Sequence, residues 1–134
     1  MQKNDFNNFP KVFTMTTQEV ADKFYELGEA NQWDKIQDEL FSDDAESIEP
    51  PNGVSAGLQS VKGKAALKQK AVDFNNSIEE VYGGYSSKPV VGGNFFSVAM
   101  GMDAKFKGMD RIKFDEICVY EVKDGKIVKE QFFH

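Results

Sequence analysis

Cysteine, histidine and arginine each occur only once in this 134-residue sequence, and these scarcities exclude several classes of site. One cysteine cannot form a disulfide within the chain. One cysteine and one histidine cannot supply the ligands of the usual zinc sites. No loop carries carboxylates at the spacing of a magnesium or calcium site. We therefore expect neither a metal ion nor another cofactor.

Positive charge is also scarce, with 16 Lys and Arg against 22 Asp and Glu and a net charge of −6. An acidic chain whose single arginine is Arg111 is poorly suited to neutralise nucleic-acid phosphates or an anionic membrane surface. The sequence has no apolar run of membrane-spanning length and no signal-peptide pattern at its start. These features favour a cytoplasmic protein that binds neither nucleic acid nor membrane.

Aromatic residues are plentiful: twelve Phe, four Tyr and one Trp make up 13% of the chain. Such rings build cores, and they also line ligand pockets. The length suits one domain. Residues 1–14 show neither a helical nor a strand period, so we expect a flexible N-terminal arm followed by one domain over residues 15–134.

Helical spacing of apolar residues predicts about three helices in the first part of the chain. The first begins at a capping box formed by Thr16 and Glu19 and ends near Gly28. A second is expected from Trp33 to Phe41. A third begins near Gly63 and ends at Gly83–Gly84. The residues expected on its buried stripe are Leu67, Phe74, Ile78 and Val81. The lysines expected on its solvated face are Lys62, Lys64, Lys68 and Lys70.

Strand patterns dominate the rest of the chain. An Asp–Gly pair at residues 124–125 predicts a hairpin between the last two strands. Helices followed by antiparallel strands indicate the α+β class. The expected strands are 45–49, before a loop at 50–53, and then 85–91, 96–106, 111–122 and 127–133.

The clearest candidate for chemistry is Glu116. Alternation along its strand places this carboxylate on the same face as Phe114, Cys118 and Tyr120, which are suited to burial. Burial without a partner raises the pKa of a carboxylate, which makes Glu116 a candidate general acid or base. A structural hydrogen bond or a lysine partner is the alternative explanation.

The segment Phe41-Ser-Asp-Asp-Ala-Glu-Ser-Ile-Glu-Pro50 resembles the nuclear transport factor 2-like superfamily, in particular its SnoaL-like members and, more distantly, the ketosteroid isomerases. The helix at 17–30, the pair Trp33–Asp34 and the closing segment 122–128 share the resemblance, which covers residues 15–134. It implies a cone-shaped, curved antiparallel sheet wrapped by the helices around an internal pocket, and a homodimer formed through the outer sheet face.

The resemblance also implies candidate catalytic residues. Glu49, immediately before Pro50, stands where the isomerases carry their catalytic Asp. Tyr25, sixteen residues before Phe41, stands at the position of their oxyanion tyrosine. Cys118 falls near their third catalytic position, and Glu116 lies on the same face. His134 lies where SnoaL-like cyclases have an acid/base Asp.

The pocket is expected to bind a small apolar molecule, and three functions remain open. The chain binds such a molecule without catalysis, or it is an isomerase, cyclase or dehydratase with Glu49, Glu116 and Tyr25 as its catalytic groups, or it is a dimeric interaction module. The expected ligand-binding residues are Trp33, Phe74, Phe96, Met100, Met102, Phe114, Cys118, Tyr120 and His134.

Overall fold

A computed structural model describes residues 14–51 and 58–134. Within these ranges, three helices precede or interrupt a seven-stranded sheet. The elements are α2 (Thr17–Glu29), α3 (Trp33–Leu40), β1 (Phe41–Ile48), β2 (Val61–Lys62), α4 (Lys64–Ser77), β3 (Ile78–Ser86), β4 (Val90–Gly92), β5 (Phe95–Phe106), β6 (Ile112–Lys123) and β7 (Lys126–Phe133).

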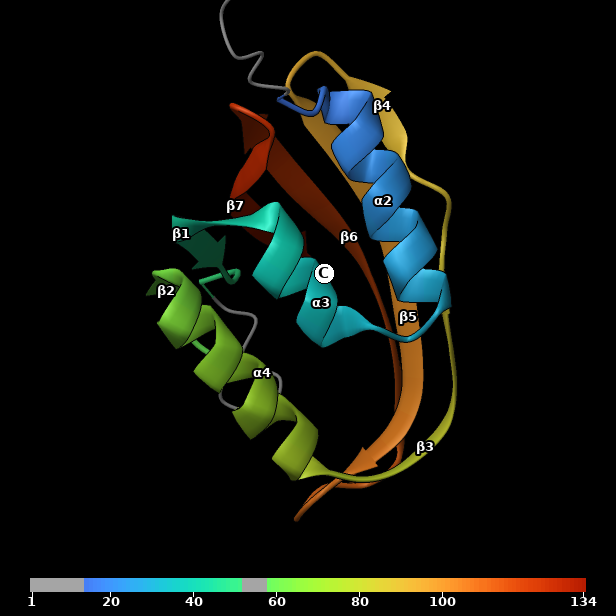
Figure 1. The fold of residues 1–134 in the computed structure, drawn as a ribbon. Helices are drawn as coiled ribbons and strands as arrows, with labels where there is room; N and C mark the ends of the chain where they lie inside the picture. Colours follow the sequence, from blue (N-terminus) through green and yellow to red (C-terminus); the bar gives the residue numbers. More distant parts are fainter. Residues whose placement is uncertain (1–13, 52–57) are drawn as a thin grey trace, which may run out of the picture.

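The sheet has the strand order β2-β1-β7-β6-β5-β3, with β4 paired to β5. It curves strongly, and α2, α3 and α4 lie on its concave side (Figure 1). This arrangement confirms the predicted α+β fold with a curved sheet wrapped by helices. One pairing differs from the expected antiparallel sheet: β1 runs parallel to β7, and the chain passes through α4 and the five strands β2 to β6 between them.

The core lies between the helices and the concave face. On α2, Val20, Phe24 and Leu27 are buried at helical spacing, as predicted. The Phe24 ring packs against two rings from the sheet, with centroids 5.4 Å from Phe96 and 4.7 Å from Tyr120. Burying such large rings supplies much of the free energy of folding.

The capping box at the start of α2 is present as predicted. The Thr16 hydroxyl accepts a hydrogen bond from the Glu19 backbone N–H at 3.1 Å, and the Glu19 carboxylate accepts one from the Thr16 backbone N–H at 2.9 Å. Two backbone donors that have no partner inside the helix are thereby satisfied.

Two helices end earlier than the sequence pattern predicts. Helix α3 ends at Leu40, and Phe41 already begins β1, where it pairs with Ile127. Helix α4 ends at Ser77, so Ile78 and Val81 belong to β3 rather than to a helical stripe. Val81 is 54% exposed. The spacing of these residues suits a helix, but pairing with β5 determines their conformation.

The remaining strands follow the sequence pattern closely. Strand β5 places Val98, Met100, Met102 and Ala104 on its inner face, and β6 and β7 are joined by the Asp124–Gly125 turn. Of the predicted strand at 85–91, the first part completes β3 and the last part forms β4. Residues 1–13 of the predicted arm and residues 52–53 of the predicted loop lie outside the described residues. Among the helices described, none is long and apolar enough to cross a membrane.

Candidate functional site

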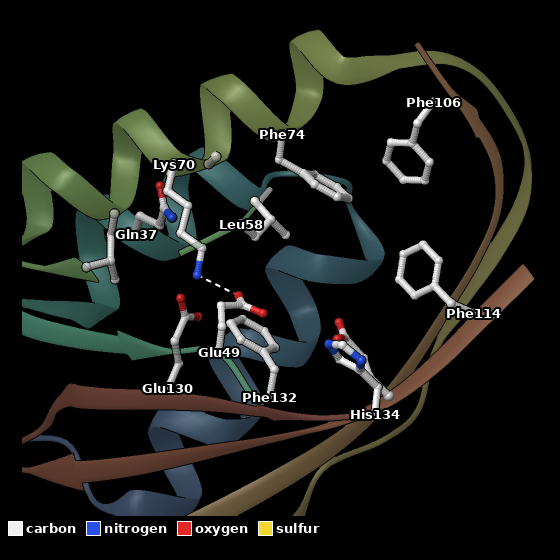
Figure 2. Close-up of a pocket in the computed structure, with 13 residues that line it drawn as sticks. Gln37, Glu49, Leu58, Lys70, Phe74, Phe106, Phe114, Glu130, Phe132 and His134 are labelled. Carbon is white, nitrogen blue, oxygen red and sulfur yellow. Dashed lines mark hydrogen bonds and ion pairs between the residues drawn. The ribbon is translucent and has the colours of Figure 1, made fainter. Parts of the chain in front are cut away.

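A cavity of about 210 Å³ lies between α4 and the ends of β1, β6 and β7 (Figure 2). We call it the Lys70 cavity. Rings from four different elements or strand ends form its apolar part, and charged groups gather at its other side. Its lining residues are Gln37, Glu49, Leu58, Leu67, Lys70, Ala71, Phe74, Phe106, Phe114, Glu116, Glu130, Phe132 and His134.

An ion pair between Lys70 and Glu49 forms the polar end of this cavity. Lys70 projects from α4, and its Nζ lies 2.6 Å from Glu49 Oε2 and 2.8 Å from Ser47 Oγ. The side chains of Lys70 and Glu49 are only 12% and 7% exposed. The ammonium group also lies 5.1 Å from the centre of the Phe132 ring. Pairing compensates in part for the cost of removing both charges from water.

Glu130 brings a second carboxylate to this end of the cavity. It is paired with Ser47 in the parallel β1–β7 ladder, and its own side chain lines the cavity beside Lys70. Burial raises the pKa of Glu130 to about 7, although the Ser47 hydroxyl and the Lys70 ammonium oppose this rise. A carboxyl group with this pKa is able both to donate and to accept a proton near neutral pH.

Glu116 lies on β6 in the wall of the cavity, where the strand alternation places it. Burial is the main cause that raises the pKa of its carboxyl group, and the charge of Glu49 acts in the same direction. His134 also lines this cavity, and its charge opposes the rise in the pKa of Glu116. The Cys118 thiol is buried and donates a long hydrogen bond of 3.7 Å to Glu116 Oε1. Burial also raises the pKa of Cys118, so its thiol stays protonated.

A larger hollow of about 580 Å³, which we call the Trp33 cavity, adjoins the first. Its walls are mostly apolar. The residues that line both cavities are Ala71, Phe74, Phe114 and Glu116, and those that line the Trp33 cavity alone include Trp33, Tyr85, Met100 and Met102.

The structure therefore separates the residues proposed from the sequence into two groups. Those that line a cavity are Glu49, Glu116, Trp33, Phe74, Met100, Met102, Phe114 and His134. The others do not line either cavity: Phe96, Cys118 and Tyr120 are packed in the core, and Tyr25 lies half-buried on α2. The structure thus does not bring Tyr25 together with Glu49.

The assignment of Lys70 to a solvated helix face is wrong. The sequence holds a signal for its true place, because Lys70 lies three residues after Leu67 and four before Phe74, on the same helical stripe. Glu130 is likewise absent from the residues proposed from the sequence. Its alternation with Phe132 indicates an inward orientation, but only the pairing of β7 with β1 brings it to Lys70. Within residues 14–51 and 58–134, no three His, Cys, Asp or Glu side chains are grouped so as to hold a metal ion.

Comparison with known proteins agrees with this architecture. The family described as "SnoaL-like domain" matches residues 15–134. A solved structure from Mesorhizobium loti, a candidate SnoaL-like polyketide cyclase with carbohydrate phosphatase in its description, is 33% identical, with a TM-score of 0.81 over 90% of this chain and all of that one. No curated protein matches the sequence significantly.

Two more distant structures share the fold. An NTF2-like protein of unknown function from Burkholderia pseudomallei is 12% identical, with a TM-score of 0.70 over 90% of this chain and 91% of that one. TerC, crystallised with polyporic acid, is 14% identical, with a TM-score of 0.68 over 87% of this chain and 89% of that one.

Proposed function

We propose that this chain, which belongs to the SnoaL-like family of the nuclear transport factor 2-like superfamily, binds a small, mostly apolar molecule in the Lys70 cavity. The observation that carries the proposal is the division of this cavity. Phe74, Phe106 and Phe114 form an apolar wall opposite the buried Lys70–Glu49 ion pair. Such walls with a few fixed polar groups are typical of small-molecule sites.

The polar end suits a ligand that carries a carbonyl or hydroxyl oxygen. The Lys70 ammonium has three donor hydrogens, of which the contacts with Ser47 and Glu49 use two. The remaining hydrogen is available to a ligand oxygen. The Mesorhizobium loti relative, described as a candidate SnoaL-like polyketide cyclase, supports this class of ligand, because polyketides are carbon-rich molecules with keto groups.

Acetophenone, with one ring and one carbonyl group, is a suitable probe for calorimetric titration. We expect saturable binding that the replacement Phe114→Asp weakens by about tenfold or more, because a charge then enters the apolar wall. Ile112→Asp is the matched control. Ile112 is two residues earlier on the same strand but 37% exposed, so its replacement should leave the affinity within about twofold. Equal effects of the two replacements would contradict the proposed site.

A second candidate function, acid/base catalysis on the bound molecule, is supported by Glu130. Its raised pKa and its position beside Lys70 suit a group that removes a proton from the carbon next to a carbonyl. The electron pair of that C–H bond would then form a C=C bond to the carbonyl carbon, and the π pair of the C=O bond would move onto the oxygen, where the Lys70 ammonium stabilises the resulting enolate. If the bound ketone has a C=C bond between its β and γ carbons, the negative charge extends to the γ carbon, and return of the proton there would complete a double-bond isomerisation.

The exchange of the benzylic protons of phenylacetone for deuterium, followed by proton NMR, tests this candidate. We expect exchange above the buffer rate, with a pH profile that has its inflection near the Glu130 pKa of about 7. Glu130→Gln should lower the rate by about a hundredfold or more while phenylacetone still binds. If the wild-type protein binds phenylacetone without accelerating exchange, it is a binding protein for such ketones and not a catalyst.

A further inference from the structure

The Lys70 cavity is small for a complete ligand site. Its volume of about 210 Å³ falls below the roughly 300–1,000 Å³ that is usual for small-molecule pockets. A single ring with a short polar substituent would fill it. The adjoining Trp33 cavity, at about 580 Å³, lies well within the usual range.

The two cavities meet at a common wall formed by Ala71, Phe74, Phe114 and Glu116. Ala71 is the smallest of these side chains. It lies on α4, one residue after Lys70 and three before Phe74, so it stands beside the polar group of one cavity and the shared ring of both. A small residue at this point leaves more room between the two cavities than a larger side chain would, and we call this point the passage.

Trp33 gives the second cavity a rigid aromatic wall. Its indole N–H donates a hydrogen bond of 3.0 Å to Asn31 Oδ1, and its ring packs edge-on against Phe24 with centroids 6.1 Å apart. Gly28 lies directly against the indole, since a Cβ at that position would be only 3.2 Å from it. Trp33 is nevertheless 40% exposed. A large, immobilised and half-exposed apolar ring is well suited to cover a flat apolar ligand.

We infer that one elongated molecule occupies both cavities, with its oxygen-bearing end at Lys70 and Glu49 and a flat apolar body that passes Ala71 to reach Trp33. The inference rests on the proposed function and adds a length and an orientation for the ligand. Glu116 then faces the middle of the molecule, because it lines both cavities.

Two ketones that differ only in length test this inference: acetophenone, with one ring, and 4-acetylbiphenyl, with two. We expect calorimetry to show that the longer ketone binds about tenfold more tightly, because its second ring is buried in the Trp33 cavity. Trp33 is the only tryptophan of the chain, so its fluorescence reports contact directly. The longer ketone should change this emission, whereas acetophenone should not.

Ala71→Leu narrows the passage and provides the decisive variant. We expect it to weaken the binding of 4-acetylbiphenyl by about tenfold and that of acetophenone by less than about twofold. Ala65→Leu, on the same helix but exposed, is the matched control and should change neither affinity. Trp33→Leu removes the aromatic wall of the Trp33 cavity. It should likewise weaken the binding of the longer ketone only.

The possible failures are distinguishable. If neither ketone binds to the wild-type protein, the proposed function itself is contradicted. If acetophenone binds and the longer ketone binds no more tightly, the proposed function stands and the two-cavity ligand is overturned. The two-cavity ligand is also overturned if Ala71→Leu weakens both ketones equally or neither of them.

Discussion

At the scale of single residues, Glu130 is the most informative group in the cavity. Strand β7 holds its carboxyl group inside the fold, and the pKa of about 7 means that the proton stays on this group in mildly acidic solution. The Glu49 carboxylate, by contrast, is held in contact with the Lys70 ammonium. Two carboxyl groups in one cavity thus have different surroundings, which is the usual arrangement for an acid and a base with separate roles.

The raised pKa of Glu130 predicts that stability falls as pH rises. Between the ordinary value of 4.5 and about 7, the folded protein binds more protons than the unfolded chain, so the free energy of unfolding decreases through this window and levels off above it. Glu130→Gln should therefore stabilise the protein at pH 8 by up to about 3 kcal/mol and have little effect at pH 4.5. Urea denaturation at both pH values measures the difference.

Glu39→Gln serves as the control, because Glu39 is an exposed residue of α3. It should keep the pH dependence of the wild-type protein. In Glu130→Gln, the free energy of unfolding should still decrease somewhat as pH rises, because burial also raises the pKa of Glu116. An unchanged difference in stability between pH 4.5 and pH 8 in Glu130→Gln would show that Glu130 ionises normally.

The sequence identifies some site residues and misses others for a physical reason. Glu116 stands out because strand alternation is a local property, which needs no knowledge of the neighbouring strand. Glu130 needs the parallel partner β1, and Lys70 needs the knowledge that Glu49 and Ser47 lie opposite its helix. The local sequence pattern of one segment does not predict its contacts with a segment far away in the chain.

At the scale of elements, a sequence pattern predicts structure reliably where the hydrogen bonds join residues that are close together in the sequence. The capping box of α2 closes within four residues, so the sequence predicts its position correctly. The end of α4 depends on a contact across the sheet: Ile78 pairs with Phe106 and Val81 with Ala104. Helical spacing cannot reveal that contact, which explains why the predicted helix is too long.

The capping box leads to a prediction for α2. Thr16→Ala removes the hydroxyl that accepts the Glu19 N–H and should lower the free energy of unfolding by about 1 kcal/mol. Thr17→Ala is the control, since Thr17 is already inside the helix, where alanine is favourable. Urea denaturation of both variants would contradict the role of the cap if Thr17→Ala proved as destabilising as Thr16→Ala.

At the scale of the whole molecule, the outer face of the sheet carries apolar side chains. Ile117 on β6 and Phe133 on β7 are directly paired, and they are 45% and 49% exposed. Phe95 on β5 is 48% exposed. Exposed apolar groups on neighbouring strands favour association, and the homodimer expected from the sequence would cover them. The proposed arm at residues 1–14 and domain at 15–134 likewise remain predictions.

We therefore predict a homodimer in which the Ile117–Phe133 pair lies in the interface. Light scattering coupled to size-exclusion chromatography should give twice the chain mass for the wild-type protein and the chain mass for Ile117→Lys, because a charge would be buried against a second copy. Val90→Lys alters a 70% exposed residue on β4 and should remain dimeric. A monomeric wild-type protein would refute the predicted dimer.

The parallel pairing of β1 with β7 has a consequence for the order of folding. It joins Ser47 to Glu130 and Phe41 to Ile127, so a loop of most of the chain must close before these strands meet. Closing so large a loop costs conformational entropy before the contacts between the two strands can offset that cost. This pairing is therefore expected among the slow steps of folding. The polar end of the Lys70 cavity, with Glu49 on one side of that closure and Glu130 on the other, can therefore form only once the closure is complete.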